Sequence, residues 1–215
     1  MRLAELSERS GISTATIKYY LRERLLRPGR RVSATQAEYD ESHLRRLRLV
    51  RALIQVGGMP VATAREVLAA VEDDSLDHHM RLGAAVWALP AEPQPAEPDA
   101  VDDAARRAAD ALLRRLGWTY GCEVGALSPA YRMLVAAIAG LSRTGYPCDV
   151  EQLLPYAKLA GQLAVTDLDM VEQYETPEEQ VEAAVALTVL YEPVLLSLRR
   201  LAEAEESNRR FGSGG

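Results

Sequence analysis

Three side chains that can bind phosphate and base edges recur along one short segment near the start of the chain. Thr14, Lys18 and Arg22 follow one another at intervals of four residues, so they share one face if residues 14–23 form a helix. Ser13 stands where the N-cap of that helix is expected. A hydroxyl and two cations on an exposed helix face can contact phosphate oxygens and base edges in a DNA groove. The segment therefore predicts nucleic-acid binding.

The charges are divided unevenly along the 215 residues. The net charge is −6, but residues 1–71 carry 13 Arg/Lys against 7 Asp/Glu, a balance of +6. Residues 72–215 carry the other 12 basic residues and 24 acidic ones, a balance of −12. Because attraction to a polyanion is local, the basic first third can bind nucleic acid although the whole chain is acidic.

Helix signals dominate the sequence, whose 48% hydrophobic and 26% charged residues are typical of a folded soluble protein. Gly11 separates the first two helices, and the turn-forming residues of 27–39 predict a loop or small wing. The predicted fold class is therefore all-α with a small winged element. Pro155 and Pro193 are expected to break or kink the last two helices. The expected helices cover residues 2–10, 14–23, 41–56, 61–71, 76–89, 99–117, 129–143, 149–175 and 177–209.

Proline-rich and glycine-rich stretches mark the expected domain boundaries. Residues 90–98 hold four prolines in nine positions and predict a semi-rigid linker. The linker separates a basic domain at 1–71 and a connecting helix at 76–89 from a helical domain over 99–209. Residues 210–215, which end in Gly-Ser-Gly-Gly, predict a flexible tail.

A series of short motifs runs in a specific order through the first third of the chain. The motifs are Leu3-Ala4-Glu5-Leu6-Ser7, Gly11-Ile12-Ser13, Thr16-Ile17-Lys18-Tyr19-Tyr20, Leu25-Leu26-x-Pro28, and Tyr39-Asp40-Glu41 followed by Leu44 and Leu47. Together they resemble the MerR family of bacterial transcriptional regulators, through about residue 71. The resemblance implies a winged helix-turn-helix at 2–39, a helical pair at 41–71 and then an antiparallel dimerisation helix.

The resemblance also implies which side chains meet DNA. The predicted contacts are Ser13, Thr14, Thr16, Lys18, Tyr19, Arg22, Arg30, Arg31 and Tyr39. Among them, the wing arginines would touch phosphates. Two departures from the family pattern reduce this surface. Thr35-Gln36-Ala37 stands where the wing usually has Gly-Tyr-Arg, and Ala15 stands where a basic residue is frequent.

A coiled-coil-like spacing of 4, 3 and 4 residues occurs at Leu76, Met80, Gly83 and Trp87. This seam and the symmetry of the family predict a homodimer, paired through the helix at 76–89. That helix would be only about 21 Å long. We therefore expect the domain over 99–209 to help hold the dimer together.

The sequence predicts no metal site, no cofactor and no enzyme. Cys122 and Cys148 are 26 residues apart with no third ligand nearby, and the neighbours His78 and His79 diverge on a helix. A metal site completed across a dimer is the alternative. Neither a nucleophile elbow nor a phosphate loop occurs. Two cysteines suit a reducing cytosol, and no apolar run approaches the roughly 18 residues of a membrane span. We therefore expect a cytoplasmic protein without a membrane partner.

Aromatic residues gather in the region over 99–209. Four of them lie in or beside an apolar helix face: Trp118, Tyr131, Tyr156 and Tyr191. Such side chains line many small-molecule sites, although packing alone is the simpler interpretation of any single one. We predict that they bind a small organic effector, at least partly apolar and either neutral or cationic.

The leading hypothesis is a ligand-responsive, sequence-specific DNA-binding transcriptional regulator. It would act as a homodimer on an inverted-repeat promoter site, with RNA polymerase as a further partner. Two alternatives stay open. One is a protein that sequesters a small molecule and binds DNA weakly, and the other is a constitutive DNA-binding scaffold without a ligand.

Overall fold

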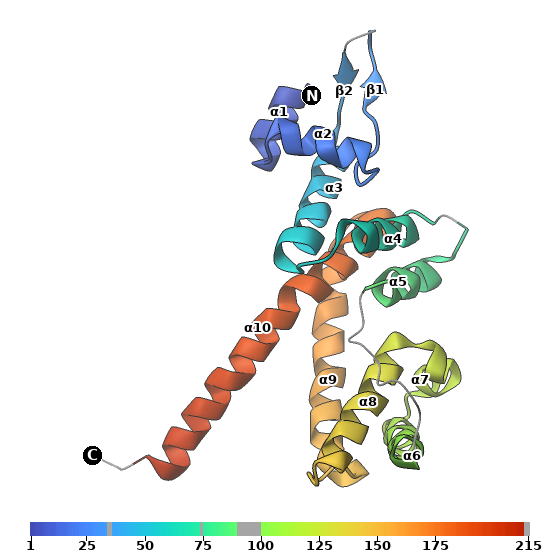
Figure 1. The fold of residues 1–215 in the computed structure, drawn as a ribbon, viewed down its shortest axis with the longest axis vertical. Coiled ribbons are helices and arrows are strands. Elements are labelled where there is room, and N and C mark those ends of the chain that lie inside the picture. The colour runs from blue at the N-terminus through green and yellow to red at the C-terminus, as the bar shows by residue number, and fades with distance from the viewer. Residues whose placement is uncertain (34–35, 74, 90–99, 213–215) are drawn as a thin grey trace. The chain divides into compact units, whose positions relative to one another are not determined.

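The computed structural model describes residues 1–33, 36–73, 75–89 and 100–212. The predicted linker at 90–98 and the end of the predicted tail lie outside these residues. Met1–Ala88 and Gln173–Gly215 form one compact unit, and Leu89–Glu172 form a second. The described elements are helices except for one two-stranded hairpin (Figure 1), so the predicted all-α class with a small winged element is confirmed.

The first unit begins with two short helices joined by a tight turn. α1 (Leu3–Ser10) ends at Gly11, whose φ of 67° is left-handed and favours glycine. α2 (Thr14–Arg22) begins after Ser13, whose hydroxyl accepts a hydrogen bond from the Thr16 N–H at 3.1 Å. The predicted cap is therefore confirmed. The side chains buried beneath these helices and the following loop are Leu6, Ile17, Tyr20, Leu25 and Leu26.

The predicted wing is a short antiparallel hairpin. β1 (Arg30–Arg31) pairs with β2 (Ala37–Glu38), and Arg30 lies opposite Glu38. Figure 1 shows the hairpin projecting beyond α1 and α2. It thus adds a second exposed basic element beside α2.

Three helical segments follow the wing and support it. α3 (Glu41–Arg51) continues into the π-helical segment η1 (Ala52–Val56), and α4 (Val61–Val71) follows after a turn. The Asp40 carboxylate caps α3 by accepting from the Ser42 N–H at 3.0 Å. The apolar residues that these segments bury include Leu44, Leu47, Val50, Leu53, Val67 and Leu68.

α5 (His78–Trp87) is shorter than the predicted helix at 76–89. The Asp77 carboxylate accepts from the Met80 N–H at 2.9 Å and thereby fixes the start of the helix. Leu76 lies before this cap, so the predicted coiled-coil seam loses its first residue. This corrects the predicted start of the helix, whereas Met80, Gly83 and Trp87 of the seam lie on α5 and its role in dimerisation stays a prediction.

α10 (Pro177–Phe211) is the longest helix among the described residues. Thr176 and Glu179 form a capping box at its start. The helix then runs unbroken through Pro193, so the expected split does not occur. A proline removes one backbone donor, but the turns on either side keep their own hydrogen bonds.

The N-terminal part of α10 packs against α3, η1, α4 and α5. A Cβ on Gly57 would lie 2.7 Å from the Val189 side chain and 2.8 Å from the Leu53 carbonyl oxygen, so glycine permits this close approach. Because of these contacts, Gln173–Gly215 belongs to the first unit. The region predicted as one domain, 99–209, is thus divided between the two units. The buried residues of α10 are Val181, Ala183 and Val185.

α10 also contains an 18-residue window with a mean hydropathy of 1.7, long and apolar enough to cross a membrane. The bent pair Thr119–Leu127 and Pro129–Arg143 passes the same test when taken as one span. The expectation that no apolar stretch approaches this length is therefore wrong. One or two such helices are weak evidence for a membrane protein, because the core helices of soluble proteins pass the same test.

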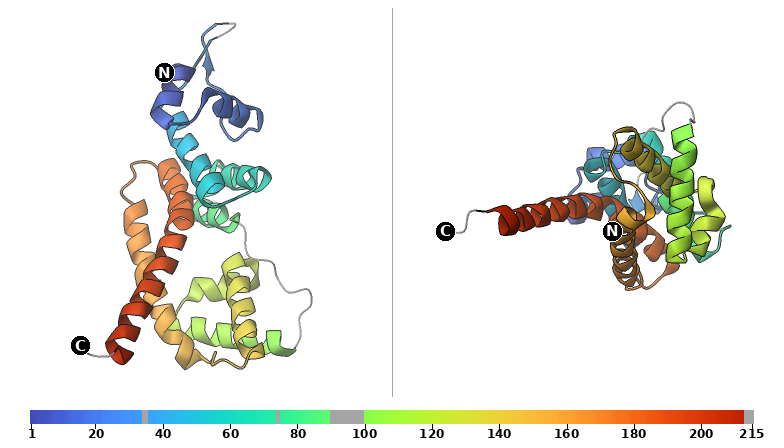
Figure 2. Two further views of the ribbon diagram at one scale, coloured as in Figure 1. Left: turned by 60° about the vertical axis from the view of Figure 1, so that its left-hand side comes forward. Right: turned by 90° about the horizontal axis from the view of Figure 1, so that it is seen from below.

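The second unit is a small helical bundle, seen in two further views in Figure 2. Its elements are α6 (Ala100–Leu116), α7 (Thr119–Val124), η2 (Gly125–Leu127), α8 (Pro129–Arg143) and α9 (Val150–Val171). α8 matches the predicted bounds, whereas α7 was missed because its six residues are too few to show a periodic pattern. α9 continues through Pro155, against the expected break. The core of the second unit contains Ala105, Ala109, Val135, Ile138 and Ala139.

Candidate nucleic-acid interface

α2 presents a polar face to solvent. Ile17 and Tyr20 fill its inner face and are buried. The Arg22 guanidinium lies 6.0 Å from the centroid of the Tyr19 ring, within the range of a cation–π interaction. The structure thus brings together, on one exposed helix face, four of the residues predicted to contact DNA. They are Thr14, Lys18, Tyr19 and Arg22.

Ser13 and Thr16 lie at the N-terminal end of the same helix. Their hydroxyl oxygens are 2.8 Å apart, and the Ser13 hydroxyl also caps the helix. Ser13 is exposed and Thr16 is half-buried. Both residues therefore stabilise the start of α2, next to the positive end of its dipole.

The wing arginines are held by neighbouring groups. Arg30 forms an ion pair with Glu38 across the hairpin, and Arg31 donates to a backbone carbonyl of the same hairpin at 3.3 Å. The Arg2 guanidinium donates to the Gln36 Oε1 at 2.6 Å and brings another cation to the wing. Sequence reasoning missed Arg2, because its partner lies 34 residues away.

Tyr39 is a correction to the predicted set of DNA contacts. Its side chain is only 8% exposed, and its ring packs edge-on against His43 with 5.2 Å between the ring centroids. Its N–H donates to the Met1 carbonyl at 2.8 Å, and its carbonyl accepts from the Met1 amino group at 2.6 Å. The ring is therefore a packing element beneath the wing and not an exposed side chain.

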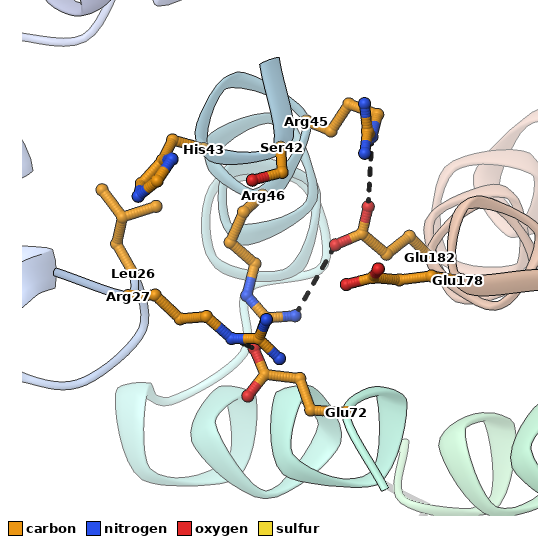
Figure 3. A pocket seen from close by; sticks show the side chains of 9 residues that line it. All are labelled: Leu26, Arg27, Ser42, His43, Arg45, Arg46, Glu72, Glu178 and Glu182. Atoms are coloured by element: carbon orange, nitrogen blue, oxygen red, sulfur yellow. Dashed lines mark hydrogen bonds and ion pairs between the residues drawn. The ribbon is translucent and has the colours of Figure 1, made fainter. Parts of the chain in front are cut away.

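A buried arginine on α3 fixes the end of α2 to the rest of the unit (Figure 3). Arg46 is 7% exposed. Its Nε donates to the Leu25 carbonyl just after α2, and its Nη2 donates to the Leu68 carbonyl on α4, both at 3.3 Å. Arg46 also forms an ion pair with Glu72, which follows α4. Three segments of the chain thus meet at one buried cation: the loop after α2, α3, and the end of α4.

α10 adds carboxylates to this site. The Arg46 Nη1 lies 3.8 Å from the Glu182 Oε1, and the Arg45 Nη1 lies 3.1 Å from the Glu179 Oε1. Burial raises the pKa of Glu182, although the neighbouring Arg46 opposes this shift. Burial also lowers the pKa of Arg46, opposed by Glu72. We call Arg45, Arg46, Glu72, Glu179 and Glu182 the Arg46 cluster.

The predicted ligand contacts of the second unit do not gather around one hollow. Trp118 lines an open hollow together with Cys122 and Glu123, among others. Tyr131 is half-buried, and its hydroxyl donates to the Asp110 Oδ1 at 2.7 Å. Burial and this hydrogen bond raise the pKa of Tyr131 to about 12. The Tyr131 hydroxyl therefore serves the packing of α8 against α6.

The other two predicted ligand contacts lie elsewhere. Tyr156 is exposed on α9 of the second unit, and Tyr191 is exposed on α10 of the first. Among the described residues, no group of three or more His, Cys, Asp and Glu side chains is arranged to hold a metal ion. Cys122 is exposed and Cys148 is partly buried, and both are free thiols.

The fold and the exposed face of α2 define a winged helix-turn-helix DNA-binding protein. Residues 1–71 match the MerR HTH family of regulatory proteins. The whole chain is similar to the candidate transcriptional regulator SCO5550 from Streptomyces coelicolor A3(2), with 56% identity over 100% of both chains and a TM-score of 0.87 to its crystal structure. No curated protein matches the chain. The chain belongs to the MerR family of transcriptional regulators.

This membership confirms the resemblance that the motifs predicted. MerR-family regulators bind promoter DNA, typically as dimers. Both the family and the similar crystal structure are described as transcriptional regulators and neither as an enzyme. DNA-binding regulation is therefore the function of the class to which this protein belongs.

Proposed function

We propose that this regulator binds an inverted repeat in promoter DNA as a homodimer, with one α2 in the major groove of each half-site. The observation that carries the proposal is the exposed face with Thr14, Lys18, Tyr19 and Arg22. The major groove admits an α-helix, and its base edges distinguish all four base pairs. A two-fold dimer would read half-sites one or more helical turns apart, each turn being about 34–36 Å.

Phosphate contacts would come from the surroundings of that face. Arg30 and Arg31 on the wing, with Arg2 beside them, can approach one strand of the duplex. Ser13 and Thr16 at the start of α2 can offer hydroxyl groups where the helix dipole favours an anion. Because Glu38 already neutralises part of the Arg30 charge, we expect α2 to contribute more affinity than the wing.

The proposed regulation is by a small organic effector bound to the second unit. The open hollow beside Trp118 supports this, because an aromatic ring exposed in a hollow offers an apolar contact. The strongly acidic second part of the sequence favours a neutral or cationic molecule. At the promoter, the bound dimer would act together with RNA polymerase. A compound that quenches Trp118 fluorescence and changes promoter affinity would support regulation by an effector. Unchanged promoter affinity would instead support a constitutive DNA-binding scaffold.

The test of the function uses the purified full chain and a labelled duplex from the region upstream of its own gene. Fluorescence anisotropy between about 50 and 200 mM salt measures affinity and its salt dependence. We expect tighter binding to this duplex than to a scrambled one. We also expect log–log slopes that steepen by about 0.9 for each phosphate contacted. Equal, weak binding to both duplexes would instead support a sequestering protein.

A further inference from the structure

The chain leaves α2 through a residue whose backbone is left-handed. Arg24 has a φ of 59° and is the one non-glycine residue with a positive φ in the part of the chain that the structure describes. Its N–H donates to the Leu21 carbonyl at 3.3 Å, and the Leu25 N–H donates to the Tyr20 carbonyl at 2.9 Å. These two hydrogen bonds form a Schellman motif, in which Arg24 occupies the left-handed position that usually holds glycine.

The contacts on either side of Arg24 fix this conformation. The carbonyl of Glu23 accepts from the Arg65 Nε, and its carboxylate accepts from the Arg65 Nη2, both at 2.9 Å. On the other side, the carbonyl of the fully buried Leu25 accepts from the Arg46 Nε. Both neighbours of Arg24 are therefore held in place. The backbone of Arg24 cannot relax without breaking these contacts.

An arginine strains the backbone at this position. In the left-handed conformation the Cβ of an L-residue crowds a carbonyl oxygen, and glycine avoids this strain because it has no Cβ. Asparagine and aspartate are among the side chains that tolerate the conformation best. Arg24 therefore makes the first unit less stable than a glycine would. Strain of this kind is concentrated at sites where a side chain has a function.

The charge of Arg24 is not used within the fold. Its side chain is exposed, and its guanidinium makes no hydrogen bond or ion pair with the residues that the structure describes. The neighbouring Arg27, by contrast, pairs with Glu72 at 3.1 Å. Arg22, two residues before Arg24, belongs to the exposed face of α2. Two exposed guanidinium groups therefore stand at the C-terminal end of α2, where they are available to a partner from outside the chain.

We propose that Arg24 binds a phosphate of the DNA backbone at the edge of the major groove, beyond the C-terminal end of α2. The inference rests on the proposed function, because it needs α2 in the major groove. The nine residues of α2 make a helix about 13.5 Å long, and the groove is about 12 Å wide. The N-terminal residues of a recognition helix face the base edges, so its C-terminal end approaches a sugar–phosphate strand. Arg24 lies just beyond that end.

A purely structural role for Arg24 is the alternative. A cation near the C-terminus of a helix interacts favourably with the helix dipole, and this interaction would offset the backbone strain. The two roles predict opposite effects of a glycine at this position. If Arg24 binds DNA, glycine stabilises the fold and weakens DNA binding. If Arg24 serves the helix, glycine destabilises the fold and leaves the DNA affinity unchanged.

Three substitutions in the full chain separate the charge from the strain. Arg24→Gly removes both, Arg24→Asn removes the charge and tolerates the backbone, and Arg24→Lys keeps both. In anisotropy titrations, the two neutral variants should bind the upstream and the scrambled duplex about 10-fold more weakly, since a phosphate contact carries no sequence information. Their log–log salt slopes should be shallower by about 0.9 for each bound copy of the chain. Arg24→Lys should bind within about threefold of the wild type, because lysine also binds phosphate.

The stability of the neutral variants should change in the opposite direction to their affinity. The fluorescence of Trp87, in a Trp118→Phe background, reports the melting temperature of the first unit. We expect this temperature to rise by about 1–4 °C in Arg24→Gly, because the left-handed backbone is then unstrained. The matched control is Arg115→Gln, which removes the same charge from an exposed position on α6 of the second unit. This control should keep the wild-type affinity and melting temperature.

Unchanged DNA affinity of Arg24→Gly would overturn the proposal, and so would an equal loss of affinity in Arg24→Lys or Arg115→Gln. A lower melting temperature of both neutral variants would assign Arg24 to the helix dipole instead. A loss confined to the upstream duplex would indicate a base contact and not a phosphate contact. The proposed function is judged separately, by whether the wild type prefers the upstream duplex to the scrambled one.

Discussion

Arg22 and Arg46 show how differently the same side chain is used in two regions of one unit. Arg22 stands exposed on α2, near the Tyr19 ring. Arg46 is buried on α3, where two backbone carbonyls and two carboxylates surround it. The exposed cation keeps its hydration until a phosphate or base replaces the water, whereas the buried one has already exchanged water for protein partners.

This difference separates binding from positioning. An exposed arginine carries no desolvation penalty in the folded protein and is available to a polyanion. A buried arginine must have its partners in place, and removing it leaves desolvated carboxylates with fewer cations: Glu72 keeps Arg27 and Glu182 keeps Arg45. The count of arginines in the first 71 residues therefore overstates the DNA-binding surface. Their burial separates the exposed arginines, which are available to a polyanion, from Arg46, which is buried and holds the end of α2.

The largest expected effect follows from removing the buried cation. Arg46→Met leaves Glu72 and Glu182 without their shared partner, and we expect the first unit to lose about 3–5 kcal/mol of unfolding free energy. Denaturant titration can follow this through the fluorescence of Trp87 on α5, in a Trp118→Phe background. The matched control is Arg48→Met on the exposed side of α3. This change should alter stability by no more than about 0.5 kcal/mol. Equal stabilities of the two variants would refute the positioning role.

A smaller effect concerns the carboxylate side of the Arg46 cluster. Burial raises the pKa of Glu182 above its ordinary value of 4.5, while Arg46 and Arg45 oppose the shift and Glu178 and Glu72 add to it. The folded state therefore binds a proton more tightly than the unfolded state. The contribution of Glu182 to the free energy of unfolding is lost as the pH rises from 4.5 through the raised pKa of the folded state. Relative to Glu182→Gln, the wild type should become less stable from pH 4.5 upward. A constant difference would contradict the shift.

Local signals in the sequence were enough to predict much of the fold. Ser13 and Gly11 mark the ends of the first two helices, and their capping roles need no distant partner. The exposed face of α2 could be predicted for the same reason, since a helix of known register determines which residues point outward. The bounds of α8 followed from its apolar periodicity.

The features that sequence reasoning missed depend on contacts between residues that are far apart in the sequence. Tyr39 is buried against His43, and its backbone pairs with Met1, 38 residues away in the sequence. α10 joins the first unit through Glu182 and Arg46, whose pairing has no local signature. Tyr191 was predicted to bind a ligand together with residues of the second unit, but α10 belongs to the first unit, so that grouping does not occur within one unit.

The central claim is that α2 reads promoter DNA through its exposed face. The chain has two lysines, Lys18 on α2 and Lys158 on α9, and both are exposed. Anisotropy titrations of promoter DNA should show Lys18→Ala binding about 10–100-fold more weakly than the wild type, because a contact to a base or phosphate is lost in each half-site. Lys158→Ala should bind like the wild type, and both variants should keep the wild-type stability. Unchanged affinity of Lys18→Ala, or equal losses in the two variants, would contradict the assignment of α2 as the recognition helix.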